Sequence, residues 1–312
     1  MESGLLCCFV KSAYKRIFPA LKFSCLFIGA MTLVYAAFHE ISYLAAEKFA
    51  ISNISSALEK RSEWEFSLSP QEEASIKTLL TQEFTYLGKG VQCFAFESSD
   101  GKYVLKFFRY ERLRAPTWLA YLPLPSPLRE RYQKKLASKK EKEEKLFRSC
   151  VLAYKELKEE SGLLFLHLTP AENFHQMVTL KDKLGRSYTL PIDQFAYFLQ
   201  RKAKPLYTAL GEWIAAGKWE EAKEALSHLL ALLEKRYQKG IVDGDAVIRK
   251  NTGFLGSQPI YIDVGQFVKD ESIKERENFQ KTTEVITSRL EEWLQKECPP
   301  LATYLKEERE KL

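Results

Sequence analysis

This sequence lacks CxxC pairs and has few histidines. Its 312 residues contain four histidines and six cysteines, and no two cysteines are spaced as CxxC. A structural zinc site needs ligands at short spacing, and a disulfide-stabilised fold needs a higher density of cysteine. The lone His167 and His175 are expected in core or surface positions. The sequence therefore indicates neither a zinc site nor a disulfide framework. The cysteines are Cys7, Cys8, Cys25, Cys93, Cys150 and Cys298.

A large excess of one charge is also missing. The chain has 47 basic and 41 acidic residues, which gives a formal net charge of +6. The densest basic run, KKLASKKEKEEK (134–145), is interleaved with glutamates and is typical of a solvated helix face. Nucleic-acid binding is therefore not expected, because it requires a concentrated basic surface.

Long apolar runs are confined to the N-terminal region. FSCLFIGAMTLVYAAF (23–38) contains no charged residue, and the apolar character extends back to residue 17 with only Lys22 interrupting it. A stretch of about 20 apolar residues is long enough to cross a bilayer. The sequence therefore predicts a basic segment over 1–16 and a single transmembrane anchor over 17–38. A cleaved signal peptide is the main alternative, although bulky Tyr35 and Phe38 make a poor cleavage region. A buried amphipathic helix is a third possibility. Adjacent Cys7 and Cys8 could accept acyl chains, but incidental thiols are the simpler interpretation.

Two strands with a glycine-rich bend are predicted further along the chain. LGKGVQCFAF (87–96) is followed by a turn and then by YVLKFF (103–108). Gly88 and Gly90 would let backbone N–H groups approach phosphates, and Lys106 would supply a point charge to them. Hairpin glycines and a solvent-facing lysine are the alternative interpretation of these residues.

A second group of polar residues lies in GIVDGDAVIRKNTGFLGSQPIYIDVGQF (240–267). Asp245 and Asn251 follow a long apolar helix, and Asp263 ends the strand-like run PIYID. A hairpin between them would return Asp263 to the side of Asn251. Oxygen ligands grouped in this way suit a magnesium ion that carries phosphates, although a strand-end Asp and a turn Asn could also serve only local structure.

The order of these motifs over residues 80–270 resembles the protein-kinase-like superfamily. That resemblance implies an α+β, bilobal fold with a small β-rich lobe and a shortened helical lobe, and it implies ATP and magnesium as cofactors. Gly88 and Gly90 would cover the phosphates, Lys106 would bind them, and Asn251 and Asp263 would hold the metal. Asp245 would take the position of the catalytic base.

The resemblance also implies a helix whose inward glutamate pairs with the strand lysine. The pattern over 131–160 is helical, and Glu143 falls on its apolar face, with Glu144 as the alternative. Glu143 would then join Lys106 in the nucleotide site. A glutamate paired only with solvent or with neighbouring lysines is the competing interpretation.

Several departures from the kinase pattern put catalysis in doubt. Five residues separate Asp245 from Asn251, where the family has four. Asp243 replaces the usual His, Cys93 replaces the third glycine, and Val264 stands in the D-V-G tripeptide. No Ala-Pro-Glu follows, and only a short charged segment remains. An extended peptide substrate is therefore not expected.

The rest of the chain is assigned by its local patterns. Residues 39–66 are expected to form a juxtamembrane helix and linker, 67–193 the small lobe, and 194–312 the shortened helical lobe. Ser69 and Pro70 predict the start of a helix over 67–84. The insertion 109–130 is rich in proline, and its apolar segment 116–127, with Trp118, could contact a protein partner or pack as an ordinary loop. Further strands are expected over 162–170, 176–182 and 183–193, with a hinge for adenine near 188–193, and helices over 195–214 and 219–240.

Three classes of function follow. The first is an atypical, membrane-anchored kinase that transfers the γ-phosphoryl group of ATP to an unknown hydroxyl. The second is a catalytically inactive pseudokinase that acts as a membrane-tethered interaction module, and the third is a purely structural membrane protein. The basic residues before the apolar run would place the domain across the membrane from the cytoplasm. ATP is scarce on that side of a membrane, which conflicts with a kinase there. Three explanations are open: the positive-inside rule fails for this protein, the domain is inactive, or the far side of the membrane is another cytosol.

Overall fold

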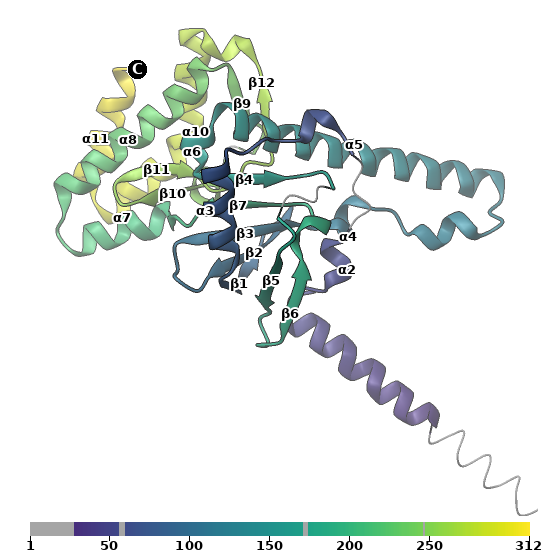
Figure 1. Ribbon diagram of the computed structural model, residues 1–312. Coiled ribbons are helices and arrows are strands. Elements are labelled where there is room, and N and C mark those ends of the chain that lie inside the picture. The colour runs from purple at the N-terminus through teal and green to yellow at the C-terminus, as the bar shows by residue number, and fades with distance from the viewer. Residues whose placement is uncertain (1–27, 56–59, 171–173, 246) are drawn as a thin grey trace, which may run out of the picture. The chain divides into compact units, whose positions relative to one another are not determined.

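The computed structural model describes residues 28–55, 60–170, 174–245 and 247–312 (Figure 1). The chain forms two compact units, Met1–Ala50 and Ile51–Leu312. In the first unit, residues 28–45 are helical. Over the described residues, no helix is both long and apolar enough to span a membrane. Residues 1–16 and part of the expected 17–38 anchor lie outside the described residues.

A seven-stranded sheet dominates the first half of the second unit. Its strand order is β4-β7-β3-β2-β1-β5-β6, and neighbouring strands are antiparallel except for the parallel pair β1–β5. Side chains of β2 alternate between buried and half-buried, as expected for a strand whose two faces differ. The strands are β1 (Glu83–Lys89), β2 (Cys93–Ser98), β3 (Tyr103–Phe108), β4 (Leu163–His167), β5 (Met177–Lys181), β6 (Ser187–Pro191) and β7 (Tyr197–Arg201).

The helix expected over 195–214 is wrong in its first part. Residues Tyr197–Arg201 form β7, which pairs with β3 on one side and β4 on the other. The first four residues of β7 are all buried. A strand covered on both faces is apolar without alternation, so its sequence cannot be distinguished from a buried helix by periodicity. The helix α7 begins only at Leu206. The chain therefore leaves the sheet at 202–205, whereas the segment 188–193, expected as the hinge, lies in and just after the edge strand β6.

Helices dominate the second half of this unit. The order of strand-rich and helix-rich parts makes the fold α+β. The helices are α7 (Leu206–Ala215), α8 (Trp219–Gln238), α9 (Ile248–Asn251), α10 (Arg276–Glu297) and α11 (Pro299–Glu310). The short strand β8 (Lys204–Pro205) precedes α7. Between the helices lie the short strands β9 (Ile241–Asp243), β10 (Thr252–Leu255), β11 (Gln258–Tyr261) and β12 (Phe267–Lys269), and the one-turn helix η4 (Glu271–Lys274).

The predicted helix start at Ser69 and Pro70 is confirmed. α3 (Pro70–Leu80) opens with a capping box, in which Ser69 and Glu72 satisfy each other's backbone N–H groups. The insertion contains the short helices α4 (Tyr110–Leu113) and η2 (Thr117–Tyr121), and α5 (Ser126–Glu156) begins with Pro127 in its first turn. The insertion therefore holds no continuous helix before Ser126, as its prolines predict, but α5 begins before residue 131, where the helical pattern was expected to start. The remaining short helices are α2 (Ile51–Ile54), η1 (Ser62–Trp64), α6 (Lys158–Ser161) and η3 (Ile192–Gln194).

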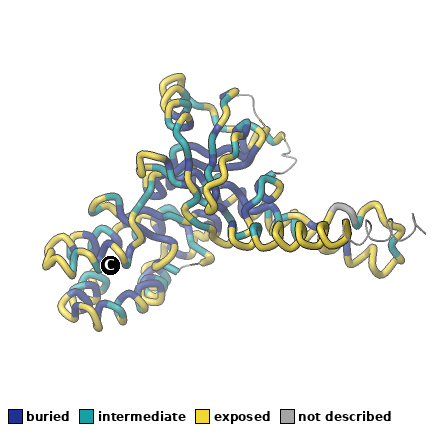
Figure 2. Tube along the Cα trace, turned by 90° about the horizontal axis from the view of Figure 1, so that it is seen from below, coloured by how far each residue is buried: buried dark blue, intermediate teal, exposed yellow. Residues whose placement is uncertain are grey.

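The second unit has two apolar cores. One lies among α7, α8, α10 and α11, and the other lies between α5, the strands β4 and β7, and the segment Tyr261–Phe267. Figure 2 shows these buried residues in dark blue. Most of residues 126–142, the outer part of the long helix α5, are exposed. The C-terminal half of α5 packs on the apolar core through Leu146, Phe147 and Cys150.

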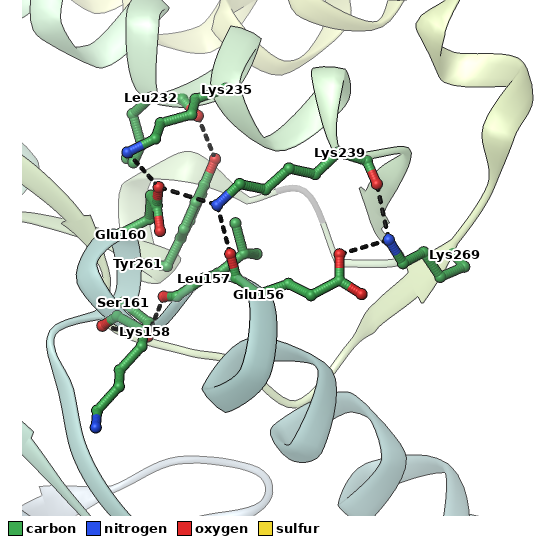
Figure 3. A network of polar contacts seen from close by, with 10 residues as sticks. All are labelled: Glu156, Leu157, Lys158, Glu160, Ser161, Leu232, Lys235, Lys239, Tyr261 and Lys269. Carbon is green, nitrogen blue, oxygen red and sulfur yellow. Dashed lines mark hydrogen bonds and ion pairs between the residues drawn. The ribbon is translucent and has the colours of Figure 1, made fainter.

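A polar network joins the end of α5 and α6 to the helical half (Figure 3). Glu160, with 6% of its side chain exposed, accepts from Lys235 at 2.5 Å and from Lys239 at 3.2 Å. Lys239 also donates to the backbone carbonyl of Glu156, whose carboxylate pairs with Lys269 at 2.5 Å. These contacts fix α5 and α6 relative to α8 and β12.

Candidate functional site

Lys106 lies in the middle of the sheet, on β3, and its ammonium points at the segment that follows β11. Nζ donates to Gln200 Oε1 at 2.9 Å and to the backbone carbonyl of Ile262. The ring of Phe198 lies 5.4 Å from the ammonium. Loss of surrounding water lowers the pKa of Lys106, and the nearby Asp263 carboxylate acts in the opposite direction. The lysine and aspartate predicted to serve one nucleotide are therefore brought to the same place.

Gln200 was not anticipated, yet it organises this side of the site. Its side-chain amide is buried, accepts from Lys106, and donates to the carbonyls of Ser161 at 2.6 Å and Tyr261 at 2.8 Å. These three hydrogen bonds satisfy both the oxygen and the nitrogen of the buried amide. The signal in the sequence was a single glutamine within the apolar run YFLQR.

The predicted hairpin between Asn251 and Asp263 is confirmed. β10 and β11 pair antiparallel, with Thr252 opposite Tyr261 at one end and Leu255 opposite Gln258 at the other. The amide of Ile262 donates to the carbonyl of Asn251 at 2.8 Å. The Asn251 side chain donates in turn to the carbonyl of Asp245 at 2.5 Å. Asn251 is thus buried against the acidic loop, whereas Asp263 is exposed at the strand end.

Three carboxylates meet at the acidic loop. Asp243 Oδ1 accepts from the amide of Asp245 at 3.0 Å, and Arg236 lies 3.8 Å from Oδ2. Burial raises the pKa of Asp243 to about 6, with the charges of Asp263 and Asp245 adding to this effect and Arg236 opposing it. Burial, more than the neighbouring carboxylates, therefore sets the affinity of Asp243 for its proton.

The glycine-rich bend lies directly over the segment Asp263–Gly265. The amide of Gly90 donates to the carbonyl of Cys93 at 2.8 Å, and Gln92 Nε2 donates to the carbonyl of Gly265 at 3.4 Å. A Cβ at Gly88 would meet no atom within 4 Å, so no contact inside the protein requires glycine there. Open space beside this backbone is what a phosphate group would need.

The helix expected to deliver Glu143 is correctly placed, but the predicted ion pair with Lys106 is not formed among the described residues. The face of α5 that meets the site is Ser149 and Cys150, about two turns further along. Cys150 is fully buried near Lys106, and this burial raises the pKa of its thiol, which therefore stays neutral. Glu143 is half-buried about two turns before Cys150, and the alternative candidate Glu144 pairs with Arg61 at 3.1 Å. Helical spacing gave the correct face but not the correct turn.

Ser149 is a second residue that sequence reasoning missed. Its Oγ donates to the carbonyl of Val264 at 2.6 Å and accepts from the amide of Phe267 at 2.6 Å. Both backbone groups belong to the segment that carries Asp263. A small polar residue on the apolar face of α5 was the available signal. Ser149 therefore connects α5 to this segment in place of a glutamate–lysine pair.

The thiol that replaces the third glycine has no features of a nucleophile. Burial raises the pKa of Cys93, and the nearby Asp263 charge raises it further. Within the described residues, no group of three or more His, Cys, Asp or Glu side chains could hold a metal ion by itself. A magnesium ion here would be held by Asp263 and the Asn251 side-chain amide oxygen, with phosphate oxygens and water completing the octahedron.

Comparison with known proteins gives a weak likeness. No family model and no curated protein matches the sequence. Among solved structures, WbdD in complex with the kinase inhibitor LY294002 matches with a TM-score of 0.33 and 17% identity over 72% of this chain. A second WbdD structure at 2.2 Å resolution matches with a TM-score of 0.31 and 17% identity over 71% of this chain. The matched region spans 45% and 44% of those chains, respectively. Similarities this weak assign neither a family nor a function to this chain.

Proposed function

We propose that this chain is an atypical kinase-like protein that binds ATP with magnesium and transfers the γ-phosphoryl group to a hydroxyl acceptor. The observation that supports it best is the convergence of Lys106 and Asp263 beneath the glycine-rich bend, with Asn251 next to Asp263 across the base of the β10–β11 hairpin. Lys106 would bind the phosphates, Asn251 and Asp263 would hold magnesium, and Gly88 and Gly90 would cover the triphosphate. Asp245 is exposed at the loop and would orient and deprotonate the acceptor.

The proposed site needs a small rearrangement to accept the nucleotide. Lys106 now donates to the Ile262 carbonyl and Gln200, and Gln92 closes onto Gly265. A triphosphate would offer Lys106 a charged acceptor in place of a carbonyl, and such charge-assisted hydrogen bonds are the stronger ones. The glycine-rich bend would then lift from Gly265 to admit the phosphates.

A thermal-shift titration of the full-length chain in mild detergent tests nucleotide binding. At an ATP concentration about 100-fold above its Kd, magnesium-ATP should stabilise the protein by about 2.7 kcal/mol and raise its Tm. Lys106→Ala and Asp263→Ala should lose this rise, because each removes one of the two charges that would hold the triphosphate and its metal. Lys102→Ala, which changes an exposed lysine just before the same strand, should keep it. Wild-type shifts in the Lys106 and Asp263 variants would exclude the proposed site.

A pseudokinase that serves as an interaction module is the second candidate. It is favoured by the longer Asp245–Asn251 spacing and by Lys106, whose ammonium donates to Gln200 and to the Ile262 carbonyl. The side chains of Thr117 and Trp118 lie outside the described residues, but Tyr121 of the insertion is 87% exposed and could contribute to a partner surface. ATP turnover that disappears in Asp245→Asn would exclude this alternative, whereas magnesium-ATP binding without turnover would support it.

Attachment to a membrane remains part of the proposal and rests on the uncharged run 23–38. Such an anchor would hold the nucleotide site near a bilayer surface. Flotation of the intact chain with liposomes, compared with a chain that begins at Ile51, would test it. Equal flotation of both chains would exclude the N-terminal anchor.

A further inference from the structure

A basic cavity lies next to the candidate nucleotide site, and its cationic side chains have no role in the proposed function. It has a volume of about 410 Å³ and lies between the glycine-rich bend, α4, residues 139–146 of α5 and the turn Gly265–Gln266. Five of its lining side chains are cationic, and none is acidic. They are Arg109, Arg112, Lys139, Lys142 and Lys145. The size lies within the range of small-molecule sites.

Two of the five cations are neutralised by nearby glutamates. Arg109 is 6% exposed and pairs with Glu111 at 2.6 Å, and Lys145 pairs with Glu141 at 2.7 Å. Within the described residues, Arg112 and Lys142 form no ion pair, and Lys139 donates only to the backbone carbonyl of Arg112. Three positive charges therefore remain around one cavity without a counter-charge.

The surroundings of Lys139 disfavour its charged form. Burial lowers its pKa, and the charges of Lys142, Lys135 and Arg112 lower it further. An anion in the cavity would reverse the effect of the neighbouring charges. Gln92 and Gln266 add neutral hydrogen-bonding groups to the same wall.

We propose that this cavity binds a small soluble compound that carries two phosphate groups. A single phosphate monoester carries a charge of about −1.5 to −2 at neutral pH, which leaves three cations only partly neutralised. Two phosphate groups match that charge, and guanidinium and ammonium groups are the usual protein ligands for phosphate. The cavity is next to Gly265, two residues after Asp263, so its ligand would bind beside the nucleotide without sharing Lys106. The proposal stands whether or not the chain binds ATP.

Calorimetric titration of the full-length protein with inorganic diphosphate, in EDTA to exclude metal-dependent binding, tests this site. Diphosphate should bind at least tenfold more tightly than inorganic phosphate. Lys139→Gln combined with Lys142→Gln should weaken diphosphate binding about tenfold or more, because each lysine would make a charge-assisted hydrogen bond. Lys281→Gln combined with Lys296→Gln removes the same charge from exposed positions on α10 and should change the affinity less than twofold. Lys106→Ala should retain binding.

Other results would overturn the proposal. Equal weakening in the two double variants would mean that diphosphate responds only to total charge. Loss of binding in Lys106→Ala would place diphosphate in the nucleotide site. Equal affinity for phosphate and diphosphate would exclude a two-phosphate ligand, and no binding at millimolar concentration would exclude an anion site altogether.

Discussion

The raised pKa of the Asp243 carboxyl makes the stability of the fold depend on pH. Its side chain is 5% exposed, and burial raises its pKa to about 6. An unfolded aspartate has a pKa of about 3.9, so the folded protein binds this proton more tightly. The contribution of Asp243 to stability is therefore fully present below about pH 4 and is lost as the pH rises through about 6.

Asp243→Asn should remove this dependence. Between pH 4 and pH 7 the free energy of unfolding of the wild type should fall by roughly 3 kcal/mol relative to that of the variant. The reason is that the pKa of Asp243 is about two units higher in the folded than in the unfolded state. Urea denaturation at several pH values in this window measures the difference. Parallel stability curves for the two proteins would show that Asp243 titrates normally in the folded state.

At the scale of elements, the contact between α5 and the Asp263 segment depends on one hydroxyl. Ser149→Ala should leave the carbonyl of Val264 and the amide of Phe267 buried without partners. Each unsatisfied group costs about 1–3 kcal/mol, so the midpoint of urea denaturation should fall clearly. Magnesium-ATP stabilisation should fall as well, because Asp263 lies on the released segment.

Ser138→Ala is the matched control for this change. Ser138 lies on the exposed outer part of the same helix, so its loss should change stability by less than about 0.5 kcal/mol. If Ser149→Ala were as mild as Ser138→Ala, α5 would not fix the Asp263 segment through Ser149.

At the scale of the whole second unit, the Glu160 network holds the sheet half against the helical half. Burial would raise the pKa of Glu160, but hydrogen bonds from Lys235, its own backbone amide and Lys239 bring it below the ordinary value. Glu160→Gln should lower stability by about 1.5–3 kcal/mol at neutral pH, the usual worth of hydrogen bonds to a charged group. Exposed Glu159 offers the control Glu159→Gln, which should have little effect.

The pH dependence of this network has the opposite sign to that of Asp243. The stability contributed by ionised Glu160 is present above the unfolded glutamate pKa of about 4.3 and is lost as the pH falls through the lowered folded value. Wild type and Glu160→Gln should therefore converge in stability as the pH falls from the unfolded value through the lowered folded pKa of Glu160. A constant difference at all pH values would show that the network acts through packing and not through charge.

Local signals were sufficient for much of the fold. The helix start at Ser69 and the β10–β11 hairpin depend on neighbours within a few residues, and both form as predicted. β7 was missed because its identity as a strand depends on β3 and β4, which lie far away in the sequence. Their hydrogen bonds outweigh any helical tendency of Phe195–Arg201.

The sequence by itself determined the chemistry available to the site: one strand lysine, the Asn251 and Asp263 pair on one hairpin, and an acidic loop before them. Each is a residue type at a short spacing, which the sequence states directly. The tertiary structure decided which groups meet. It placed Gln200 and the Ile262 carbonyl on Lys106, where Glu143 was expected, and put Ser149 on the segment that carries Asp263. It also gathered the cations of α4 and α5 around one cavity. These contacts depend on how far α5 extends past the sheet and on packing between distant residues, which no local pattern specifies.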